Sequence, residues 1–504
     1  MRYVVYGIMA VACYEILRAL FLSKIRNMLY RSVRDYLEKN QIRLDTFKLM
    51  HKIVVKQDLL NDSDIHQAII RYARQRDVKI QDVQYQVEEY IEEIVPFFNL
   101  LSYYKIGYWV ANFFLNLLYE VVIDHENAEK LEKIPPGSVV VFVMNHRSNI
   151  DYILVAYMLA KQISLSYAVG EWARVWPLEY IFKSFGAYFI RRKFREPLYH
   201  LVLEKYVQLI SLQGVTQGIF LEGALTRDGT FRSAKVGILD YIIKIKKNPG
   251  LERELVFVPA AINYDWVLED RTLVQEWKKG KEKSGFTDNA FSLVRILVKG
   301  PLTLTANVVR YLTGRLKNHG YASVSFGDPV LLSEVLSQQQ DIFHIDRYER
   351  LSIVQAFGES LLDRIGKVIP VTPVCITAHA LLQFDRGEVE KSDLIHMVAA
   401  IRGTIKASGG RIVTGKTFER NLHIHEHLKA EKDDRTKELV SFEEDFLEFE
   451  NAKQTVELAL DLLKRRKIIS IRNVTIVVNT KNRVLLEYYA NSLGRLGGNG
   501  SLKT

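Results

Sequence analysis

The sequence predicts an α/β domain over residues 96–335, flanked by a helical domain over residues 1–95 and a mostly helical domain over residues 336–504. Four short apolar runs inside the central range favour this class, because their length and composition are typical of buried strands. Each of these runs ends in polar or special residues. The first flanking range is rich in charged residues that favour helices and lacks the alternation of half-buried strands.

Residues 1–95 contain apolar runs only within helical sequence, which indicates a helical N-terminal domain. The first of these runs, residues 3–14, is followed by Glu15 and Arg18 and is too short for a membrane span of about 20 residues. No small-residue cleavage pattern follows it, so a signal peptide is not expected. An amphipathic anchor and a poor first span remain the alternatives for this segment, since Glu15 and Arg18 could pair across one helical turn.

Residues 107–123 are predicted to form one helix that opens the central domain. Asn112, Asn116 and Glu120 recur every four positions on an otherwise apolar and aromatic sequence. This narrow polar stripe suits a helix that lies at a membrane interface, and a buried core helix is the alternative. From these segments we expect peripheral or shallow association with a membrane surface.

The first predicted strand covers residues 139–144 and is followed by a helix over residues 152–160. Between them lies the block HRSNID, in which His146 and Asp151 are five positions apart. Ligands bind at the carboxyl ends of strands in open α/β sheets, and an imidazole held there by a carboxylate can remove a proton from a hydroxyl near neutral pH. Ser148 and Asp151 also match a helix capping box, so a capping role for Asp151 is the alternative.

A second apolar run, residues 186–190, leads directly into Arg191, Arg192 and Lys193. Guanidinium groups bind phosphate oxygens in bidentate fashion and stay charged, so this strand end suits a phosphate. A solvated basic strand end is the alternative.

The third and fourth runs complete the series. Residues 218–221 lead to Glu222 and a turn rich in glycine, in which Asp228-Gly229 alone would be only a turn signal. Residues 255–261 contain Pro259, which is expected to end its strand because proline has no amide hydrogen for the ladder.

The four blocks HRSNID, YFIRRK, FLEGALTRDG and FVPAAINY, in this order, resemble the four motifs of the glycerolipid acyltransferases that carry a His, four residues and an Asp. The closest resemblance is to the bacterial membrane-bound glycerol-3-phosphate acyltransferases and their dihydroxyacetone-phosphate relatives. It covers most of residues 96–335, and a weaker likeness continues in residues 488–492. The resemblance implies a mixed sheet flanked by helices, no cofactor, and acyl transfer from acyl-coenzyme A or acyl carrier protein to the sn-1 hydroxyl of glycerol 3-phosphate.

The resemblance also implies a role for each matching residue. His146 would be the general base on the acceptor hydroxyl, and Asp151 would hold the imidazole in the correct tautomer. The substrate alcohol is then the nucleophile, so no covalent enzyme intermediate is needed. Arg191 and Arg192 would bind the acceptor phosphate. Glu222 and Gly223 would shape the acceptor pocket, and Pro259 would lie beside the acyl portion.

Leu225 is a departure from the family pattern, because an arginine is expected at this position of the third block. Loss of a cation that faces phosphate should weaken binding by about 1.5 to 3 kcal/mol. We expect Arg227, Arg232 or Lys235 to substitute for it. The alternatives are acylation of dihydroxyacetone phosphate or lysophosphatidate, and a non-catalytic homologue that binds lipid or acyl carrier protein.

Composition agrees with these expectations without deciding among them. A chain of 504 residues is long enough for two or three domains. The 69 Lys and Arg residues exceed the 59 Asp and Glu residues, and the net charge of +10 favours anionic partners such as phospholipid headgroups, coenzyme A or acyl carrier protein. No nucleic-acid-binding motif is present, and a nucleic-acid partner is not expected. Cys13 and Cys375 lie far apart and fit no metal-ligand or redox spacing, which indicates a reducing compartment.

The C-terminal range is predicted to be helical from residue 338 onward. Residues 426–450 carry mixed charges and are expected to form a solvated helix or linker. A helix over 452–466 and a strand over 474–478 indicate a small accessory unit that resembles a winged helix. His423, His425 and His427 alternate as metal ligands on a strand could, but no further ligands accompany them and no metal site is expected.

Overall fold

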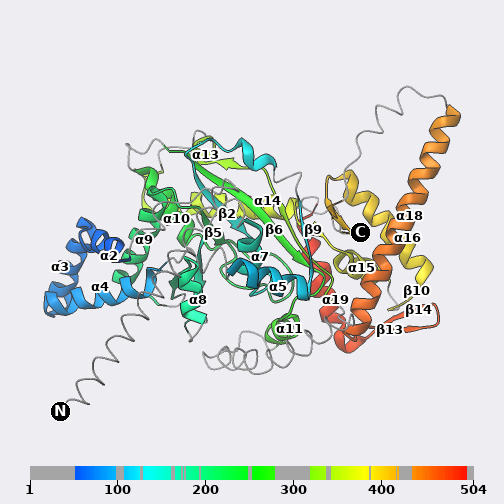
Figure 1. Ribbon diagram of the computed structural model, residues 1–504, viewed down its shortest axis with the longest axis horizontal. Helices are drawn as coiled ribbons and strands as arrows, with labels where there is room; N and C mark the ends of the chain where they lie inside the picture. The colour runs from blue at the N-terminus through cyan, green and yellow to red at the C-terminus, as the bar shows by residue number, and fades with distance from the viewer. Residues whose placement is uncertain are drawn as a thin grey trace, which may run out of the picture. The chain divides into compact units, whose positions relative to one another are not determined.

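The computed structural model (Figure 1) describes residues 52–97, 107–124, 129–159, 165–171, 174, 178–191, 194–247, 253–278, 318–336, 342–384, 387–415, 417–418 and 434–496. The chain divides into two compact units, one within residues 1–112 and 156–206 and the other within residues 113–155 and 207–504. These units do not follow the boundaries of the three predicted domains, which stay a prediction. The predicted segment 3–14, Cys13, Arg192 and the histidines at 423, 425 and 427 lie outside the described residues.

The first unit combines N-terminal helices with a pair of strands. Its helices are α2 (Lys52–Leu60), α3 (Ser63–Arg76), α4 (Ile80–Ile94) and α8 (Leu178–Ser184), and α9 (Pro197–Leu212) begins in it. Strands β3 (Ser166–Gly170) and β4 (Tyr188–Ile190) pair in parallel. Asp62 caps α3 by accepting hydrogen bonds from the amides of Asp64 and Ile65, as expected for an aspartate at a helix start.

The second unit contains the mixed sheet. Its strands follow the order β1 (Glu120–Ile123), β7 (Tyr321–Phe326), β6 (Leu255–Tyr264), β2 (Val139–Met144) and β5 (Gln217–Phe220). β2 runs parallel to both β6 and β5, whereas β6 runs antiparallel to β7 and to the short β8 (Val330–Leu331). Every residue of β2 and β6 is buried, as a continuously apolar central strand requires. The predicted α/β class with a mixed sheet is confirmed.

The predicted end of a strand at Pro259 is wrong, because β6 continues through this residue to Tyr264. The β8 ladder ends at Phe257 and the β7 ladder begins at Ala260, so Pro259 lies in a gap between two partners. The carbonyl of Pro259 accepts a hydrogen bond from the Gly327 amide on this side. The nitrogen and the carbonyl of one strand residue point to the same edge of the strand. The nitrogen of Pro259 therefore points into the gap between β8 and β7, where its missing hydrogen costs no ladder hydrogen bond.

The predicted single helix over residues 107–123 is also wrong. Helix α5 covers Tyr108–Leu118, and Glu120 already belongs to β1, which pairs with β7 in parallel. The β-branched run Val121-Val122-Ile123 accounts for the change, because such residues fit a strand better than a helix. Among the described residues, every helix is too short or too polar to cross a membrane.

The rest of the second unit is mostly helical. Helices α7 (Asp151–Leu159, which begins here), α10 (Gly237–Ile243), α11 (Asp270–Lys278), α13 (Leu332–Leu336) and α14 (Arg347–Lys367) accompany the sheet. Helices α15 (Pro373–Leu382), α16 (Lys391–Ala407) and α18 (Asp434–Arg465, the long orange helix in Figure 1) pack on one another. Two small sheets hold β10 (Glu388–Glu390), β14 (Thr475–Val478) and β13 (Ile469–Arg472), and β12 (Thr417–Phe418), β11 (Arg411–Thr414) and β9 (Pro370–Val371). The described chain ends with α19 (Arg483–Ala490) and the 3-10 turn η7 (Asn491–Leu493).

Candidate active site

His146 and Asp151 form a buried pair at the carboxyl end of β2. The side chains are 2% and 0% exposed, and Nδ1 of His146 lies 2.9 Å from Oδ2 of Asp151. The same Oδ2 accepts hydrogen bonds from the amides of Arg147 (2.7 Å) and Ser148 (3.0 Å), at the start of α7. One carboxylate therefore holds both the imidazole and the backbone of the loop that leads into α7, which begins at Asp151 itself.

The contact with Asp151 determines which nitrogen of the imidazole is free. Nδ1 faces the carboxylate and carries the proton in the neutral ring, which leaves Nε2 as the acceptor. Nε2 lies 3.4 Å from the hydroxyl of Tyr152, and the Phe220 ring packs against the imidazole with a centroid distance of 4.3 Å. The ring is thus held on both sides with its basic nitrogen turned away from the carboxylate.

Glu222 binds the main chain at His146. One carboxylate oxygen accepts the amide of His146 and the other accepts the amide of Arg232, each at 2.9 Å. The carbonyl of His146 in turn accepts the amide of Thr226 at 3.1 Å. Burial raises the pKa of Glu222 to about 7, while both amides act in the opposite direction. Glu222 therefore joins the first and third sequence blocks through main-chain contacts.

Gly223 begins the turn after Glu222 in a left-handed conformation, with φ of +66°. A Cβ atom at this position would lie 2.8 Å from Cγ of Lys235, so the side chain of Lys235 packs directly on the glycine. Any other residue would be strained here and would push Lys235 aside.

The cations expected to replace the missing arginine have different surroundings. Nε of Arg227 pairs with Glu276 at 3.2 Å, and Nη1 of Arg232 donates to the carbonyl of Leu225 at 3.3 Å. Within the described ranges, the Lys235 ammonium group makes no ion pair or hydrogen bond. Of the three, only Arg227 is paired with a carboxylate within these ranges, and Lys235 is the one whose charged group makes no polar contact there.

Arg191 belongs to the first unit, where Glu93 binds it through both carboxylate oxygens. Its guanidinium also lies over the Phe194 ring, at 4.7 Å from the centroid. The hydrogen bond with Glu93 raises the pKa of Arg191. A phosphate would have to compete with this carboxylate, and the phosphate-binding role of Arg191 stays a prediction. The role of Pro259 beside the acyl portion also stays a prediction; this residue pairs with Val143 of β2.

Sequence reasoning missed three residues that support the pair. Tyr264, at the end of β6, donates its hydroxyl hydrogen to Oδ1 of Asp151 at 2.7 Å. Asn145 exchanges two hydrogen bonds with the main chain of Ile262 and so fixes the end of β2 to β6. Glu269 accepts from the Ser148 hydroxyl at 2.8 Å, and burial raises its pKa. Only Tyr264 lies within one of the four sequence blocks, as the last residue of FVPAAINY.

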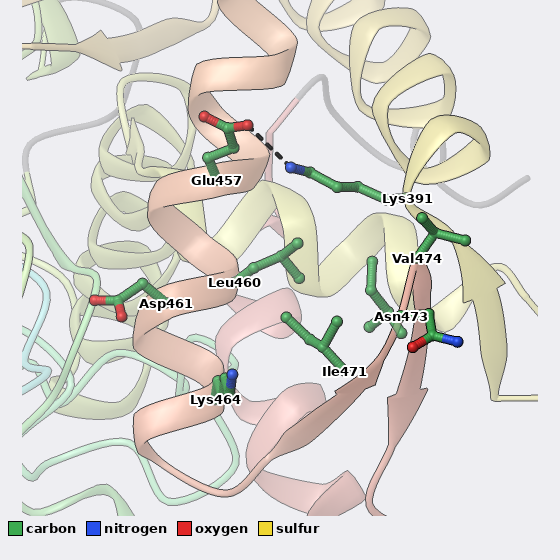
Figure 2. Close-up of a pocket in the computed structure, with 9 residues that line it drawn as sticks. Lys391, Glu457, Leu460, Asp461, Lys464, Ile471, Asn473 and Val474 are labelled. Carbon is green, nitrogen blue, oxygen red and sulfur yellow. Dashed lines mark hydrogen bonds and ion pairs between the residues drawn. The ribbon is translucent and has the colours of Figure 1, made fainter.

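A cavity of about 330 Å³ lies elsewhere in the second unit, between α18 and the hairpin of β13 and β14 (Figure 2). Lys391 and Glu457 pair across it at 2.9 Å, as the dashed line shows. The residues that line it come from α16, α18 and the hairpin and include none of the motif residues: Lys391, Glu457, Leu460, Asp461, Lys464, Ile471, Asn473, Val474 and Ile476. Its acidic and basic side chains balance, which indicates no preference for a charged ligand. Among the described residues, no group of three or more His, Cys, Asp or Glu side chains could hold a metal ion.

Comparison with known proteins supplies independent information on the chain. The family described as Acyltransferase matches residues 125–263, and the family described as Glycerol-3-phosphate acyltransferase C-terminal region matches residues 305–448. A glycerol-3-phosphate acyltransferase of Aeromonas hydrophila is 28% identical over 381 residues, which are 73% of this chain and 44% of the relative. One of Haemophilus influenzae is 26% identical over 387 residues, or 75% and 45% of the two chains.

The chain spans less than half the length of these curated relatives. Among solved structures, the 1-acyl-sn-glycerophosphate acyltransferase of Thermotoga maritima aligns with 53% of this chain and 78% of its own, at 15% identity and a TM-score of 0.28.

Proposed function

The chain belongs to the glycerol-3-phosphate acyltransferase family, and from this membership we propose that it transfers a fatty acyl group from a thioester to the sn-1 hydroxyl of glycerol 3-phosphate. The product is lysophosphatidate, and the reaction is the first step of phospholipid synthesis. Acyl-coenzyme A or acyl carrier protein supplies the acyl group.

The buried contact of His146 with Asp151 carries this proposal. As the acceptor oxygen attacks the thioester carbonyl, Nε2 of His146 removes the hydroxyl proton. The new C–O bond forms, the C–S bond breaks, and the imidazolium returns the proton to the departing thiolate. Asp151 stabilises the imidazolium, and its own charge is stabilised by the amides of Arg147 and Ser148 and the hydroxyl of Tyr264.

Lys235 and Arg232, just after the third block, are the proposed phosphate-binding groups. They follow the turn that Glu222 anchors, and neither is paired with a carboxylate within the described residues. Leu225, which stands where the family has an arginine, favours a second candidate. In this second candidate the same chemistry acts on dihydroxyacetone phosphate or lysophosphatidate.

Association with the cytoplasmic face of the inner membrane is part of the proposal. The net charge of +10 favours an anionic surface, and Trp109 on α5 is 65% exposed. Sedimentation with vesicles of phosphatidylethanolamine and phosphatidylglycerol tests this point. Binding that falls as salt rises supports a peripheral mode, and recovery of all protein in the supernatant would contradict it.

The activity is tested by thiol release from palmitoyl-coenzyme A and from palmitoyl-acyl carrier protein, with vesicles present. Glycerol 3-phosphate, dihydroxyacetone phosphate, lysophosphatidate and no acceptor are compared on one preparation. His146→Ala is the test variant, and His66→Ala, a change at an exposed histidine of α3, is the matched control.

Release that requires glycerol 3-phosphate and is lost only in His146→Ala supports the proposal. Release with another acceptor alone reassigns the substrate. Donor binding without release on any acceptor would favour a non-catalytic lipid-binding homologue.

A further inference from the structure

The C-terminal helix α19 and the turn η7 contact the loop that follows Glu222. Nδ2 of Asn491 donates to the carbonyl of Asp228 at 2.8 Å. The neighbouring Gly229 has φ of +86°, and a Cβ atom there would lie 1.9 Å from the carbonyl oxygen of Tyr488. Main chain therefore packs on main chain at this point, with no space for a side chain between them.

Arg147, the residue after His146, is enclosed by the same two segments. The side chain is 2% exposed, and its Nη1 donates to the carbonyl of Gly229 at 2.8 Å. The centre of the guanidinium lies 5.1 Å from the centroid of the Tyr488 ring. Nε and Nη2 are buried and have no hydrogen-bond partner. A buried cation with so few hydrogen bonds depends on the ring face for compensation.

Tyr488 contacts the Arg147 guanidinium through the face of its ring and not through its hydroxyl. The hydroxyl is buried and has no hydrogen-bond partner, and burial raises its pKa well above the usual range. Phenylalanine at position 488 would keep the ring face and remove an unsatisfied polar atom. Leucine would remove the ring face and keep much of the apolar volume.

Other contacts hold α19 to the elements that support the catalytic pair. The Tyr489 hydroxyl donates to the buried Asp270 at 2.6 Å, and Arg466 pairs with the same carboxylate. The residue before Asp270 is Glu269, which accepts from the Ser148 hydroxyl. Two consecutive carboxylates therefore bind α19 and the loop of His146, respectively.

We propose that Tyr488 and Asn491 are positioning residues of the acyltransferase centre. Tyr488 holds Arg147 in the loop between His146 and Asp151. Asn491 holds the turn of Asp228 and Gly229, which precedes the proposed phosphate-binding cations Arg232 and Lys235. Tyr488 and Asn491 lie beyond the ranges that the two families match, which end at residues 263 and 448. The inference rests on the proposed acyl transfer and extends its site to the end of the described chain.

The test compares Tyr488→Leu with Tyr488→Phe, and Asn491→Ala with Asn482→Ala, in the full chain. Asn482 also donates to a main-chain carbonyl, that of Lys467, but on an exposed surface, so it is a matched control for loss of one such bond. The measurements are kcat, KM for glycerol 3-phosphate, thermal unfolding, and amide hydrogen exchange at Gly229 and Thr230.

We expect Tyr488→Leu to lower kcat/KM roughly 10- to 30-fold per folded molecule, as loss of a desolvated cation–π contact implies. Tyr488→Phe, which keeps the ring face, should retain the wild-type kcat/KM. Asn491→Ala should raise KM more than it lowers kcat. Amide exchange at Gly229 and Thr230 should be faster in Tyr488→Leu and in Asn491→Ala, even if no acceptor is turned over. The exchange measurement therefore separates failure of this inference from failure of the proposed function. A lower melting temperature with unchanged kinetic constants and unchanged local exchange would show a merely structural role and overturn the inference.

Discussion

The hydroxyl of Tyr264 donates a hydrogen bond of 2.7 Å to Oδ1 of Asp151, the oxygen that does not face His146. Tyr264 stands at the end of β6, and β6 is the parallel neighbour of β2. Each oxygen of the carboxylate thus has its own partners, and the pair is oriented from two strands at once. Burial, together with the charge of Asp151, raises the pKa of Tyr264, so this residue stays a donor.

Tyr264→Phe removes this donor and should lower kcat by roughly 10- to 100-fold, the range for one hydrogen bond to a charged group. The expected cause is weaker fixing of the carboxylate that stabilises the imidazolium. Steady-state kinetics with saturating donor measure the effect. Tyr157→Phe, which removes a hydroxyl bonded to the neutral Asn112 at 2.7 Å, is the matched control and should leave kcat within about twofold. Equal losses in both variants would contradict the assignment.

Asp151→Asn separates the structural role of this side chain from the catalytic one. The asparagine oxygen can still accept the amides of Arg147 and Ser148, so the loop before α7 should persist, but the side-chain amide would favour the wrong tautomer of His146. We expect kcat to fall about 10³-fold or more while the melting temperature changes by only a few degrees. Asp62→Asn at the start of α3 is the control, since Asp62 also accepts two backbone amides. Retention of more than a tenth of the activity in Asp151→Asn would be incompatible with the proposed base.

Glu222 should make stability depend on pH, because burial raises its pKa from 4.5 to about 7 in the folded chain. The folded state then holds a proton that the unfolded state has already released. Stability from this group is present below the unfolded pKa and is lost as pH rises toward 7. Relative to Glu222→Gln, the wild type should lose up to roughly 3 kcal/mol of unfolding free energy between pH 4.5 and pH 7.5, because a pKa difference of 1 between the folded and unfolded states corresponds to about 1.36 kcal/mol.

Urea denaturation of both proteins across this range measures the difference. Glu388→Gln, at an exposed residue of β10, is the control, and its stability should run parallel to that of the wild type across this range. A constant gap between the wild type and Glu222→Gln would mean that Glu222 keeps an ordinary pKa.

Local pattern was sufficient to predict β2, because a central strand buried on both faces must be apolar throughout, and residues 139–144 form this strand as expected. It failed at Glu120, whose spacing from Asn112 and Asn116 imitates a helix although the valines after it favour a strand. It failed again at Pro259, because a gap between two partner strands is a property of the sheet and not of the sequence around the proline.

The supports of the site could not be predicted from spacing. The contact of Tyr264 with Asp151 spans 113 positions and that of Asn491 with Asp228 spans 263, so both depend on how the sheet and the C-terminal helix pack. His146 and Asp151 were accessible to prediction because a single loop and one helix start bring them together. Glu222 was predicted from its motif although it lies 76 positions from His146, so the residues that were missed are those, such as Asn491, that no motif singled out.

Lys235 offers the clearest test of how the chain compensates for Leu225. Its stem packs on Gly223, and its ammonium group has no carboxylate partner among the described residues. Lys235→Met keeps the stem and removes the charge, so KM for glycerol 3-phosphate should rise about tenfold or more with a smaller change in kcat. Lys247→Met, at an exposed lysine of the short 3-10 helix Lys244–Lys247, is the control.

Leu225→Arg should then lower KM in the Lys235→Met background, because it restores a cation at the position where the family carries one. The double variant is compared with both single variants in a cycle, and a coupling of the two effects is expected for cations that serve one phosphate. Independent, additive effects would mean that Lys235 and position 225 act on different groups. An unchanged KM in Lys235→Met would instead mean that Arg232 binds the phosphate, or that Arg227 does so after its ion pair with Glu276 has opened.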